Sequence, residues 1–429
     1  MDRLEVRLEG RLAGHFVRRD PRKIGLVYDM DWIKAWQDGR AHALSVSLPV
    51  MSEEQDATAF AAGLLPDSAR HRTLLADELG IAEDPSDFAF LSKLGRDCAG
   101  ALIVAPAGAG HSGPPDLKPI TVADLAEHLR ALPRRPLMID EHEGLTLSLA
   151  GVNDKAAIVL RKREISLPLN GYPSTHIIKV DIPGLPESVK TEHFCLRLAS
   201  AIGIRVPRSQ LARAEDQDFL LVARYDRGRD QEGKIIRVHQ EDFCQALGVP
   251  PGRKYERHGG PGWAEAFELV RSRIQDGNAL QELARMAVFQ FLIGNPDAHA
   301  KNYSLLHLGQ SGRLRLAPLY DLNNAAAFRH YFKKARPIMA MNVGEESNPD
   351  EVRWSDWDSF AESCRLGHQM VRTLVMETAL ATLDVLPAVM ADMPTSPAIQ
   401  AAHDDIRDRC LRWTQEPNAP DLGSPDPAM

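Results

Sequence analysis

The chain has 429 residues, of which 44% are hydrophobic and 26% are charged. These values are typical of folded globular proteins, so they exclude a largely disordered, coiled-coil or collagen-like chain, and the length favours two or three domains. The formal net charge of -8 argues against direct nucleic-acid binding by the surface, because phosphate contacts need clustered Lys and Arg.

The cysteines and the apolar runs indicate a compartment. Five cysteines, at positions 98, 195, 244, 364 and 410, occur without close pairs. This pattern fits neither a disulfide framework nor a zinc site and favours a reducing cytoplasm. The strongest apolar run, residues 286–293, is far shorter than the roughly 18 residues that a membrane helix needs. We therefore expect a cytoplasmic protein that does not bind a membrane.

The first 105 residues predict a small α+β subdomain. Leu4, Val6 and Leu8 alternate with charged residues, which is typical of a half-buried strand and unlike the apolar core of a secretory signal. A second strand-like run covers residues 26–28, and helical periodicity covers residues 57–65 and 71–79. From residue 105 the sequence APAGAGHSGPPDLKP is rich in Ala, Gly and Pro, so residues 106–119 are expected to form an exposed linker.

Residues 120–250 predict the strand-rich part of a second domain, and residues 251–413 predict a helical lobe. The first part contains helices at 122–132 and 189–202 and strands at 145–150, 156–161, 176–180 and 219–223. Helical periodicity dominates residues 264–292 and 357–409. Residues 414–429 are rich in Pro and Gly and are expected to be a disordered tail. The expected fold class is α+β, with a strand-rich lobe followed by a helical lobe.

The strongest chemical signal is IGNPDAHAKNYSLL at residues 293–306, in which Asp297 and Asn302 stand five residues apart after an apolar helix. Phosphoryl transfer needs a carboxylate beside the incoming hydroxyl and oxygen ligands for magnesium. The same spacing occurs in the catalytic loop of protein kinases, where the two residues are the base and a metal ligand. Taken alone, the pair is also explained by an Asx-rich turn after a helix.

A second acid follows in LRLAPLYDLNN, where Asp321 comes soon after a short apolar strand. Gly309 and Gly312 predict a hairpin between Asn302 and this segment. On its own, Asp321 is as readily a turn or capping residue. The order of base, amide ligand and second acid within one short stretch favours a magnesium site.

Two charged residues upstream match the needs of a nucleotide site. Lys179 ends the strand THIIKV and is placed to pair with nucleotide phosphates, although a lysine at a strand end is often only a solvated charge. Glu192 opens the following helix and is a candidate partner for Lys179. A favourable interaction with the helix dipole explains Glu192 equally well.

The segment LSLAGVNDK at residues 147–155 predicts a turn between two strands, with Ser148, Gly151 and Lys155 as its notable residues. Its backbone N–H groups could lie over ATP phosphates, with Lys155 adding charge. A single glycine matches neither a Walker loop nor a kinase Gly-rich loop, so the pattern alone favours a plain hairpin turn.

The histidines predict no metal site. His299 has no second His or Cys at ligand spacing, and magnesium prefers oxygen ligands. We expect His299 to support the catalytic loop, and His176 and His193 to be structural.

Seven separated segments, in this order, resemble the HipA family, the serine/threonine kinase toxins of bacterial toxin–antitoxin pairs. They are LGRDCAGAL at 94–102, LSLAGVNDK at 147–155, THIIKV at 175–180, RYDR at 224–227, EDFCQALG at 241–248, KYE with GGPG within 254–262, and GNPDAHAKN at 294–302. The resemblance implies a two-lobed, protein-kinase-like fold that carries an extra N-terminal α+β subdomain.

The resemblance also assigns roles to residues. It implies that Asp297 is the catalytic base, that Asn302 and Asp321 are ligands of Mg²⁺, and that Lys179 binds the nucleotide. The implied ATP contacts further include the loop residues Ala150, Gly151, Val152, Asn153, Asp154 and Lys155, the hinge residues Ala223, Arg224 and Tyr225, and His299, Ala300, Lys301 and Tyr320. Ser148 matches the autophosphorylated serine of the family, and a phosphate there should repel ATP phosphates and silence the kinase.

The resemblance implies partners that the chain itself does not reveal. Family members pair with a small helix-turn-helix antitoxin, HipB-like, so DNA is contacted only through that partner. Their reported protein substrates include aminoacyl-tRNA synthetases. The loop reads GVNDK where a familiar family form has Gln and Glu before the Lys. Backbone contacts to the nucleotide should survive this change. The shorter side chains bear instead on the stability of the silenced loop conformation.

Two other functions remain compatible with the sequence. Small-molecule and lipid kinases also use an Asp and an Asn five residues apart. A catalytically inactive corepressor or scaffold for a DNA-binding partner is the alternative of a different class. The presence of Lys179, Asp297, Asn302 and Asp321 together favours an active kinase that uses ATP and Mg²⁺ to modify a protein serine or threonine.

Overall fold

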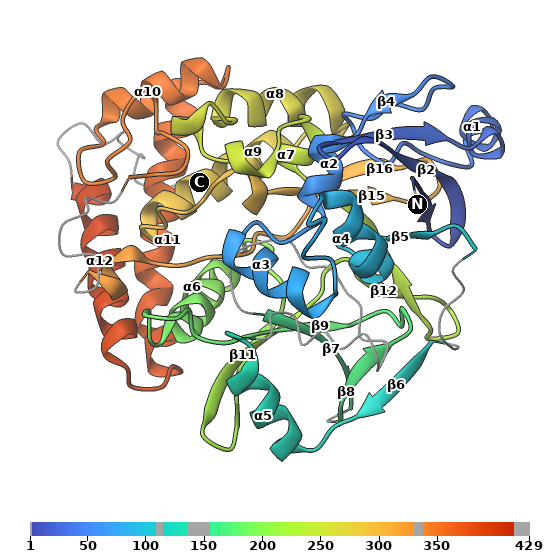
Figure 1. Cartoon of the computed structure of the whole chain (residues 1–429). Coiled ribbons are helices and arrows are strands. Elements are labelled where there is room, and N and C mark those ends of the chain that lie inside the picture. Colours follow the sequence, from blue (N-terminus) through green and yellow to red (C-terminus); the bar gives the residue numbers. More distant parts are fainter. Residues whose placement is uncertain (1, 109–114, 135–154, 163, 330–337, 416–429) are drawn as a thin grey trace. The chain divides into compact units, whose positions relative to one another are not determined.

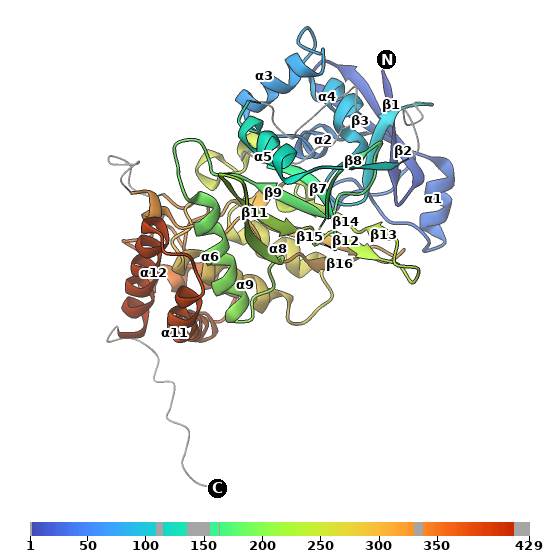
Figure 2. The same ribbon diagram turned by 90° about the horizontal axis from the view of Figure 1, so that it is seen from below.

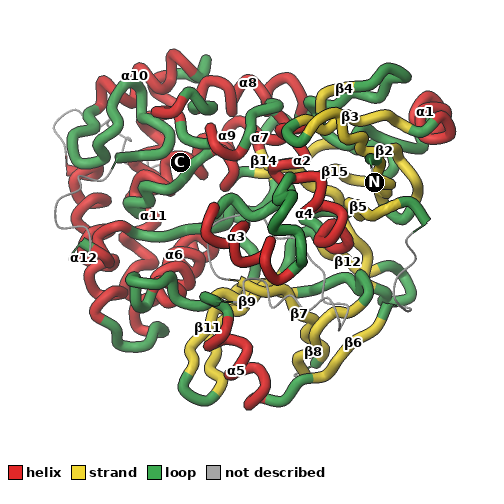
Figure 3. Tube along the Cα trace, viewed as in Figure 1, coloured by secondary structure: helices red, strands yellow, loops and turns green. Residues whose placement is uncertain are grey.

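The computed structural model describes residues 2–108, 115–134, 155–162, 164–329 and 338–415 (Figure 1). The chain forms two compact units: unit 1 comprises Met1–Val189, Pro207–Lys254 and Tyr303–Ala317, and unit 2 comprises Lys190–Val206, Tyr255–Asn302 and Pro318–Met429. Every described strand belongs to unit 1, and the long helices α8 to α12 belong to unit 2 (Figure 3). The expected succession of a strand-rich part and a helical part is confirmed.

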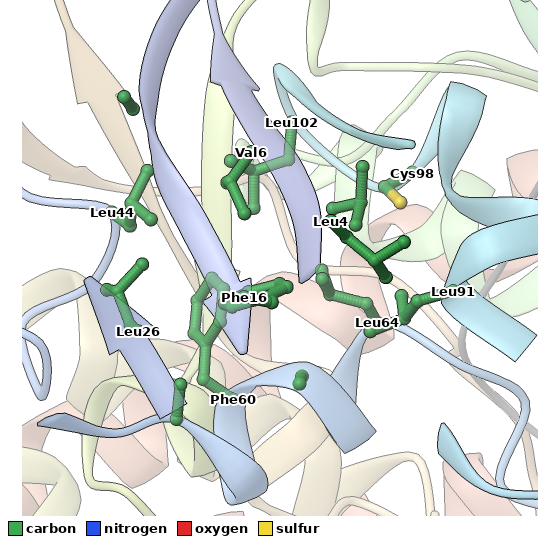
Figure 4. Packing of buried hydrophobic residues seen from close by; sticks show 14 of the residues in the cluster. Leu4, Val6, Phe16, Leu26, Leu44, Phe60, Leu64, Leu91, Cys98 and Leu102 are labelled. Atoms are coloured by element: carbon green, nitrogen blue, oxygen red, sulfur yellow. The ribbon is translucent and has the colours of Figure 1, made fainter. Parts of the chain in front are cut away.

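The N-terminal part of unit 1 is an antiparallel sheet in the order β4-β3-β2-β1-β5, covered by short helices. Its elements are β1 (Arg3–Leu8), β2 (Arg11–Asp20), β3 (Lys23–Tyr28), α1 (Met30–Gln37), β4 (Gln55–Asp56), α2 (Thr58–Gly63), α3 (Ala69–Glu78), α4 (Asp87–Leu94), η1 (Gly95–Asp97) and β5 (Leu102–Pro106). Leu4 and Val6 point from β1 into the core beside Phe16 and Leu102 (Figure 4), and Leu8 is a buried member of the same core. The alternation that predicted this strand therefore marks its buried face.

A second sheet of unit 1 has the order β10-β11-β9-β7-β8-β6. Its elements are β6 (Asp116–Pro119), α5 (Val122–Ala131), β7 (Lys155–Arg161), β8 (Glu164–Leu169), β9 (His176–Lys179), β10 (Ser209–Ala214) and β11 (Gln217–Ala223). Helix α5 covers one face (Figure 2), where Leu125 and Leu129 join a core with Ile158, Ile178 and Leu221. The predicted strands at 156–161, 176–180 and 219–223 are confirmed, whereas the last four residues of the predicted linker form β6 on this sheet.

Two small sheets complete unit 1. One consists of β12 (Arg227–Arg229) and β13 (Ile235–Arg237), and the other of β14 (His239–Asp242), β15 (Ser304–Leu308) and β16 (Arg313–Leu316). Between β14 and β15 in the chain, unit 1 also contains α7 (Phe243–Ala246) and η3 (Pro251–Arg253). Gly309 and Gly312 adopt φ angles of 66° and 63° in the turn between β15 and β16, which confirms the predicted hairpin.

Unit 2 is helical. Its elements are α6 (Ser188–Ala201, whose first two residues belong to unit 1), η4 (Glu256–His258), α8 (Trp263–Arg273), α9 (Ala279–Leu292), η5 (Ala300–Asn302), η6 (Ala325–Phe328), α10 (Trp354–Ser363), α11 (His368–Ala391) and α12 (Pro397–Gln415). The helical stretch predicted at 264–292 is two helices, because the turn-forming sequence Asp276-Gly277-Asn278 separates them. The stretch predicted at 357–409 is three helices.

Helix α11 is the longest described helix of unit 2 and is rich in apolar residues. It has 24 residues, and an 18-residue stretch within it has a mean hydropathy of 1.6, so by length and composition it could cross a membrane. Arg372, Glu377 and Asp384 interrupt its sequence, so it contains no uninterrupted apolar run of membrane-spanning length. In the fold, Val371, Val375 and other apolar side chains of α11 are buried within unit 2, as in the core helix of a globular domain.

The compact units and the predicted domain boundaries differ, since unit 1 contains both the predicted subdomain 1–105 and most of the predicted part 120–250. The hairpin β15–β16 lies within the predicted helical lobe 251–413 but belongs to unit 1. Helix α6 lies within the predicted part 120–250, but most of it belongs to unit 2. Helix α12 also continues to Gln415, beyond the predicted start of the tail at 414. The predicted strand at 145–150 and the tail from 416 onward lie outside the described residues.

The buried His193 of α6 predicts a loss of stability in acid. Burial, with a smaller contribution from Arg197, lowers the pKa of His193 to about 4. The unfolded chain binds this proton with a pKa of about 6.5, so the stability from neutral His193 is present above that pH and is lost as pH falls towards 4. We expect this proton to contribute a slope of up to about 1.4 kcal/mol per pH unit to the free energy of unfolding.

Urea unfolding at several pH values between 7 and 4 measures this slope. His193→Gln should flatten the pH dependence by the contribution of one proton, because the variant has no imidazole to titrate. Identical slopes for the two proteins would show that His193 does not titrate between the folded and unfolded states.

Candidate active site

The loop that carries the predicted base begins where α9 ends. Gly294 follows the helix with a φ of 65°, the left-handed conformation that commonly ends helices. A Cβ at this position would lie 3.0 Å from Asp405 Oδ2 and 3.2 Å from Asn324 Nδ2, so a larger residue would also crowd these two side chains. The buried Asn324 donates to Ile293 O (2.7 Å) and accepts from Ala327 N, and thereby fixes the helix end against η6.

Asn295 connects the two acids of the proposed metal and base chemistry. Its Oδ1 accepts a hydrogen bond from the backbone N–H of Asp297 (3.2 Å), and its Nδ2 donates to the backbone carbonyl of Asp321 (3.1 Å). Nδ2 also donates to Gln290 Oε1 of α9 at 2.9 Å. A single buried amide therefore holds the segments of Asp297 and Asp321 beside each other.

Asn302 is fixed by the same loop. Its Nδ2 donates to the carbonyl oxygen of Asp297 at 2.8 Å, and its backbone N–H donates to His299 O at 2.8 Å. The amide orientation follows from this contact, since the nitrogen faces Asp297 and the Oδ1 atom is the one that can bind a cation. Tyr320 Oη donates to Lys301 O (2.7 Å), which attaches the segment before Asp321 to η5.

The carboxylate of Asp297 is more than half exposed, with 58% of the side chain accessible. Its Oδ1 accepts a hydrogen bond of 2.6 Å from Tyr255 Oη, and its Oδ2 lies 4.0 Å from His299 Nε2. His299 is buried, and its ring meets the ring of Tyr255 edge-on with centroids 5.3 Å apart. His299 thus packs behind the loop, which agrees with the supporting role expected for it.

Asp321 has an unusual backbone. Its φ of 55° lies in the left-handed region, which Asp and Asn enter more easily than other non-glycine residues. The hydrogen bond from Asn295 to its carbonyl oxygen stabilises this conformation. Strained residues of this kind cluster at functional sites, where the surrounding structure holds them.

Lys155 and Lys179 are direct cross-strand neighbours on β7 and β9. In antiparallel strands, opposed residues point to the same face, so both side chains lie on the face opposite α5, together with that of Leu220. Lys179 is buried and Lys155 is partly buried. Two lysines on one face of the sheet contribute positive charge of the kind that attracts phosphate.

The predicted hinge residues follow β11. Arg224 donates its backbone N–H to Thr175 O at 2.9 Å, and Ala223 donates to Arg208 O at 2.8 Å. Both donors are therefore used within the protein, so an adenine contact at this point would need a carbonyl oxygen or Tyr225. The side chain of Arg224 is buried in an ion cluster, which excludes a side-chain contact with nucleotide at this position.

This ion cluster joins two of the motifs identified in the sequence, LGRDCAGAL and RYDR, and adds Arg237. Arg224 forms a forked pair with Asp226, at 2.9 and 2.7 Å, and lies 3.5 Å from Asp97, which also pairs with Arg227 and Arg237 at 3.0 Å each. Burial alone would raise the pKa of Asp97, but the guanidinium groups of Arg227, Arg224 and Arg237 lower it below its ordinary value. Arg224 and Arg227 likewise lower the pKa of Asp226 against the effect of burial.

The structure describes only some of the remaining predicted residues. Ser148, Ala150, Gly151, Val152, Asn153 and Asp154 lie outside the described residues, so their roles remain predictions. Lys155 is the first residue of β7 rather than part of a turn. Glu192 lies in the second turn of α6, since the helix begins at Ser188 and has no acidic residue in its first turn. The helix-dipole explanation of Glu192 is therefore wrong.

The sequence reasoning missed three residues: Tyr255, Asn295 and Asp97. All three lie in segments that carried the resemblance, namely KYE, GNPDAHAKN and LGRDCAGAL. Their roles depend on contacts with residues 26 to 140 positions away, which spacing does not reveal. The only available signal was their presence in those segments.

Comparison with known proteins decides the family. The HipA-like C-terminal domain matches residues 147–386, more than half of the chain, and the HipA N-terminal domain matches residues 4–105. The protein Y4mE of Sinorhizobium fredii is 38% identical over 398 residues, which cover 91% of this chain and 92% of Y4mE. The chain belongs to the HipA family.

Other relatives support the assignment of this chain to the HipA family. The serine/threonine-protein kinase toxin HipA of Shewanella oneidensis is 27% identical over 340 residues, 76% of each chain. A chain in the solved complex of the Shewanella oneidensis toxin–antitoxin system, which contains HipA, HipB and operator DNA, superposes with a TM-score of 0.81 at 24% identity. That match covers 95% of this chain and 97% of the other. The expected kinase-like α+β fold is confirmed, and this HipA-family protein is a kinase.

Proposed function

We propose that this HipA-family kinase transfers the terminal phosphoryl group of Mg²⁺-bound ATP to a serine or threonine hydroxyl of a protein. The observation that carries the proposal is the contact of Asn295 with both Asp297 and Asp321. Together with the orientation of Asn302, it supports the proposal that Asp297 is the base and that Asn302 and Asp321 are oxygen ligands, since all three residues belong to unit 2.

The residues fit magnesium rather than a tightly caged metal. Among the residues that the structure describes, no group of three His, Cys, Asp or Glu side chains is arranged to hold a metal ion. Magnesium is commonly bound by one or two protein oxygens together with substrate phosphates and water. Asn302 Oδ1 and the Asp321 carboxylate would hold it, and the bound ion would neutralise charge on the phosphates.

The protein groups divide the work of the reaction. Lys155 and Lys179 are proposed to bind the phosphates of ATP. Asp297 accepts the proton of the acceptor hydroxyl through the carboxylate oxygen that does not bond Tyr255. Ala300 and Lys301 lie in η5 between His299 and Asn302 and are proposed, with Tyr320, to contact the nucleotide.

The biological proposal is a toxin of a toxin–antitoxin pair that acts in the cytoplasm. The solved relative forms a complex with HipB and operator DNA, which supports a HipB-like helix-turn-helix antitoxin as partner, with DNA contacted through it. An aminoacyl-tRNA synthetase is the proposed type of substrate. Autophosphorylation at Ser148, beside Ala150 to Lys155, is the proposed way in which the kinase silences itself.

Mass spectrometry after incubation with Mg-ATP tests this function. The expected result is one phosphoryl group on Ser148 and, when a synthetase and its tRNA are added, phosphoryl transfer to the synthetase. Lys179→Met should weaken ATP binding by about 10- to 100-fold, because it removes a charge-assisted contact to phosphate, and should suppress both modifications.

Lys23→Met, on an exposed position of β3, is the matched control and should behave as the wild type. Label from ATP that appears only in small molecules or lipids would support the alternative kinase class. Absence of ATP binding by calorimetry with magnesium present would instead favour the inactive scaffold and contradict the proposal.

A further inference from the structure

Among the described residues that were not predicted as part of the site, Tyr255 is the one whose hydroxyl directly contacts Asp297, the proposed base. It lies in the segment KYE, just before η4, and belongs with Asp297 to unit 2. Its Oη donates to Asp297 Oδ1 at 2.6 Å, a short distance that is typical of an O–H group bonded to a carboxylate.

The aromatic ring of Tyr255 is fixed on several sides. His299 and His258 meet it edge-on, with centroids 5.3 and 5.6 Å away and interplanar angles of 82° and 77°. The guanidinium carbon of Arg257 lies 4.4 Å from the ring centroid, a cation–π distance. These contacts hold the hydroxyl at a defined position.

The backbone of the same turn is fixed as well. Tyr255 O accepts hydrogen bonds from His258 N and Gly260 N, at 2.9 and 3.0 Å. Glu256 N donates to Ala340 O, and the Glu256 carboxylate accepts from Asn342 N at 2.6 Å. The turn is therefore anchored on the segment that follows residue 337, so the hydroxyl of Tyr255 rests on a rigid support.

The contact leaves the second carboxylate oxygen for chemistry. A general base must present one oxygen within hydrogen-bond reach of the acceptor hydroxyl. Tyr255 occupies Oδ1, while Oδ2 is the oxygen 4.0 Å from the His299 ring on a side chain that is 58% exposed. A hydrogen bond to one oxygen fixes the rotation of the carboxylate about its Cβ–Cγ bond, so it also fixes the direction of the other oxygen.

We propose that Tyr255 is a positioning residue, which orients the Asp297 carboxylate so that Oδ2 faces the acceptor hydroxyl during phosphoryl transfer. The inference deepens the proposed function and rests on it, because it requires Asp297 to be the base. A fixed, non-reacting tyrosine explains the anchored ring better than a mobile gate or a phosphate acceptor, which would need the ring to move.

Tyr255→Phe tests this role in the full chain, because it removes the hydroxyl and keeps the packed ring. We expect turnover, measured as transfer of label from γ-labelled ATP to protein in a cell extract, to fall by about 10- to 100-fold, the value of a hydrogen bond to a charged group. Calorimetric affinity for an ATP analogue with Mg²⁺, and the thermal midpoint, should remain at the wild-type values. Tyr172→Phe, at the turn after β8, is the matched control and should leave turnover unchanged.

A double-mutant cycle separates positioning from structural support. If Tyr255 acts only through Asp297, adding Tyr255→Phe to Asp297→Asn should lower the residual turnover no further. A structural role would instead reduce activity in both backgrounds and lower the thermal midpoint. Such a result, a fully active or hyperactive Tyr255→Phe, or phosphate found on Tyr255 would overturn the proposal.

The activity of the wild-type protein separates a failure of the proposed kinase function from a failure of the role proposed for Tyr255. If wild-type protein transfers no label to protein, the proposed function fails. If the wild type is active and Tyr255→Phe matches it, only the role of Tyr255 fails.

Discussion

Replacing Asp297 by Asn should lower phosphoryl transfer by about 10²- to 10⁴-fold, because the side chain then has no carboxylate to accept the proton of the acceptor hydroxyl. The fold should be unaffected. The amide oxygen can still accept from Tyr255, and the backbone of residue 297 keeps its hydrogen bonds to Asn295, His299 and Asn302. Initial rates of label transfer from γ-labelled ATP measure the effect.

Two further measurements make this result specific. Calorimetry should show unchanged binding of Mg-ATP, since Asn302, Asp321 and Lys179 are retained. Asp384→Asn, on an exposed position of α11, is the control and should keep full activity. Wild-type rates for Asp297→Asn would remove Asp297 as the base and leave the proposed mechanism without its central residue.

Asp97→Asn should destabilise the protein by about 3–5 kcal/mol, which is a large part of the free energy of unfolding of an ordinary domain. Asp97 is buried, with 2% exposure, and pairs with Arg227 and Arg237 beside Arg224. The variant keeps the shape of the side chain but leaves three guanidinium groups with Asp226 as the remaining carboxylate of the cluster. The cost is therefore that of buried charge without compensation, and the midpoint of urea unfolding measures it.

The comparison for this variant is an exposed ion pair of the same residue type. Asp31 pairs with Lys34 at 3.3 Å on α1, with 90% and 68% of the two side chains exposed. Asp31→Asn should change the unfolding free energy by less than about 1 kcal/mol. Equal effects of Asp97→Asn and Asp31→Asn would mean that the buried cluster adds no stability beyond that of a surface pair.

Much of the fold follows from the periodicity of the sequence. Leu4, Val6 and Leu8 predicted β1 because each points into the same core, and α6 was predicted within one residue at both ends. The boundaries between successive helices were harder to predict, since Gly277 and its neighbours separate α8 from α9 within a continuous helical pattern. Whether a segment such as α11 lies in a protein core depends on what packs around it, which a single sequence does not specify.

The candidate site could be predicted at the level of reacting groups but not at the level of their supports. Asp297, Asn302 and Asp321 were readable because the chemistry requires those residue types within a short stretch. Asn295 and Tyr255 act through hydrogen bonds to atoms 26 and 42 positions away, so their roles depend on tertiary contacts. The burial of the Arg224 side chain in an ion cluster likewise depends on Asp97, which lies over a hundred residues earlier in the chain.

The ion cluster of Asp97 limits how this protein can evolve by recombination. The arginines around it, Arg224, Arg227 and Arg237, lie in the region matched by the HipA-like C-terminal domain, whereas Asp97 lies in the region matched by the HipA N-terminal domain. A gene fragment that encodes either region alone would lack either Asp97 or the three arginines, so buried charges would be left without their partners. The two regions must therefore be inherited together, and exchange with a distant relative succeeds only where both sides of this balance are carried over.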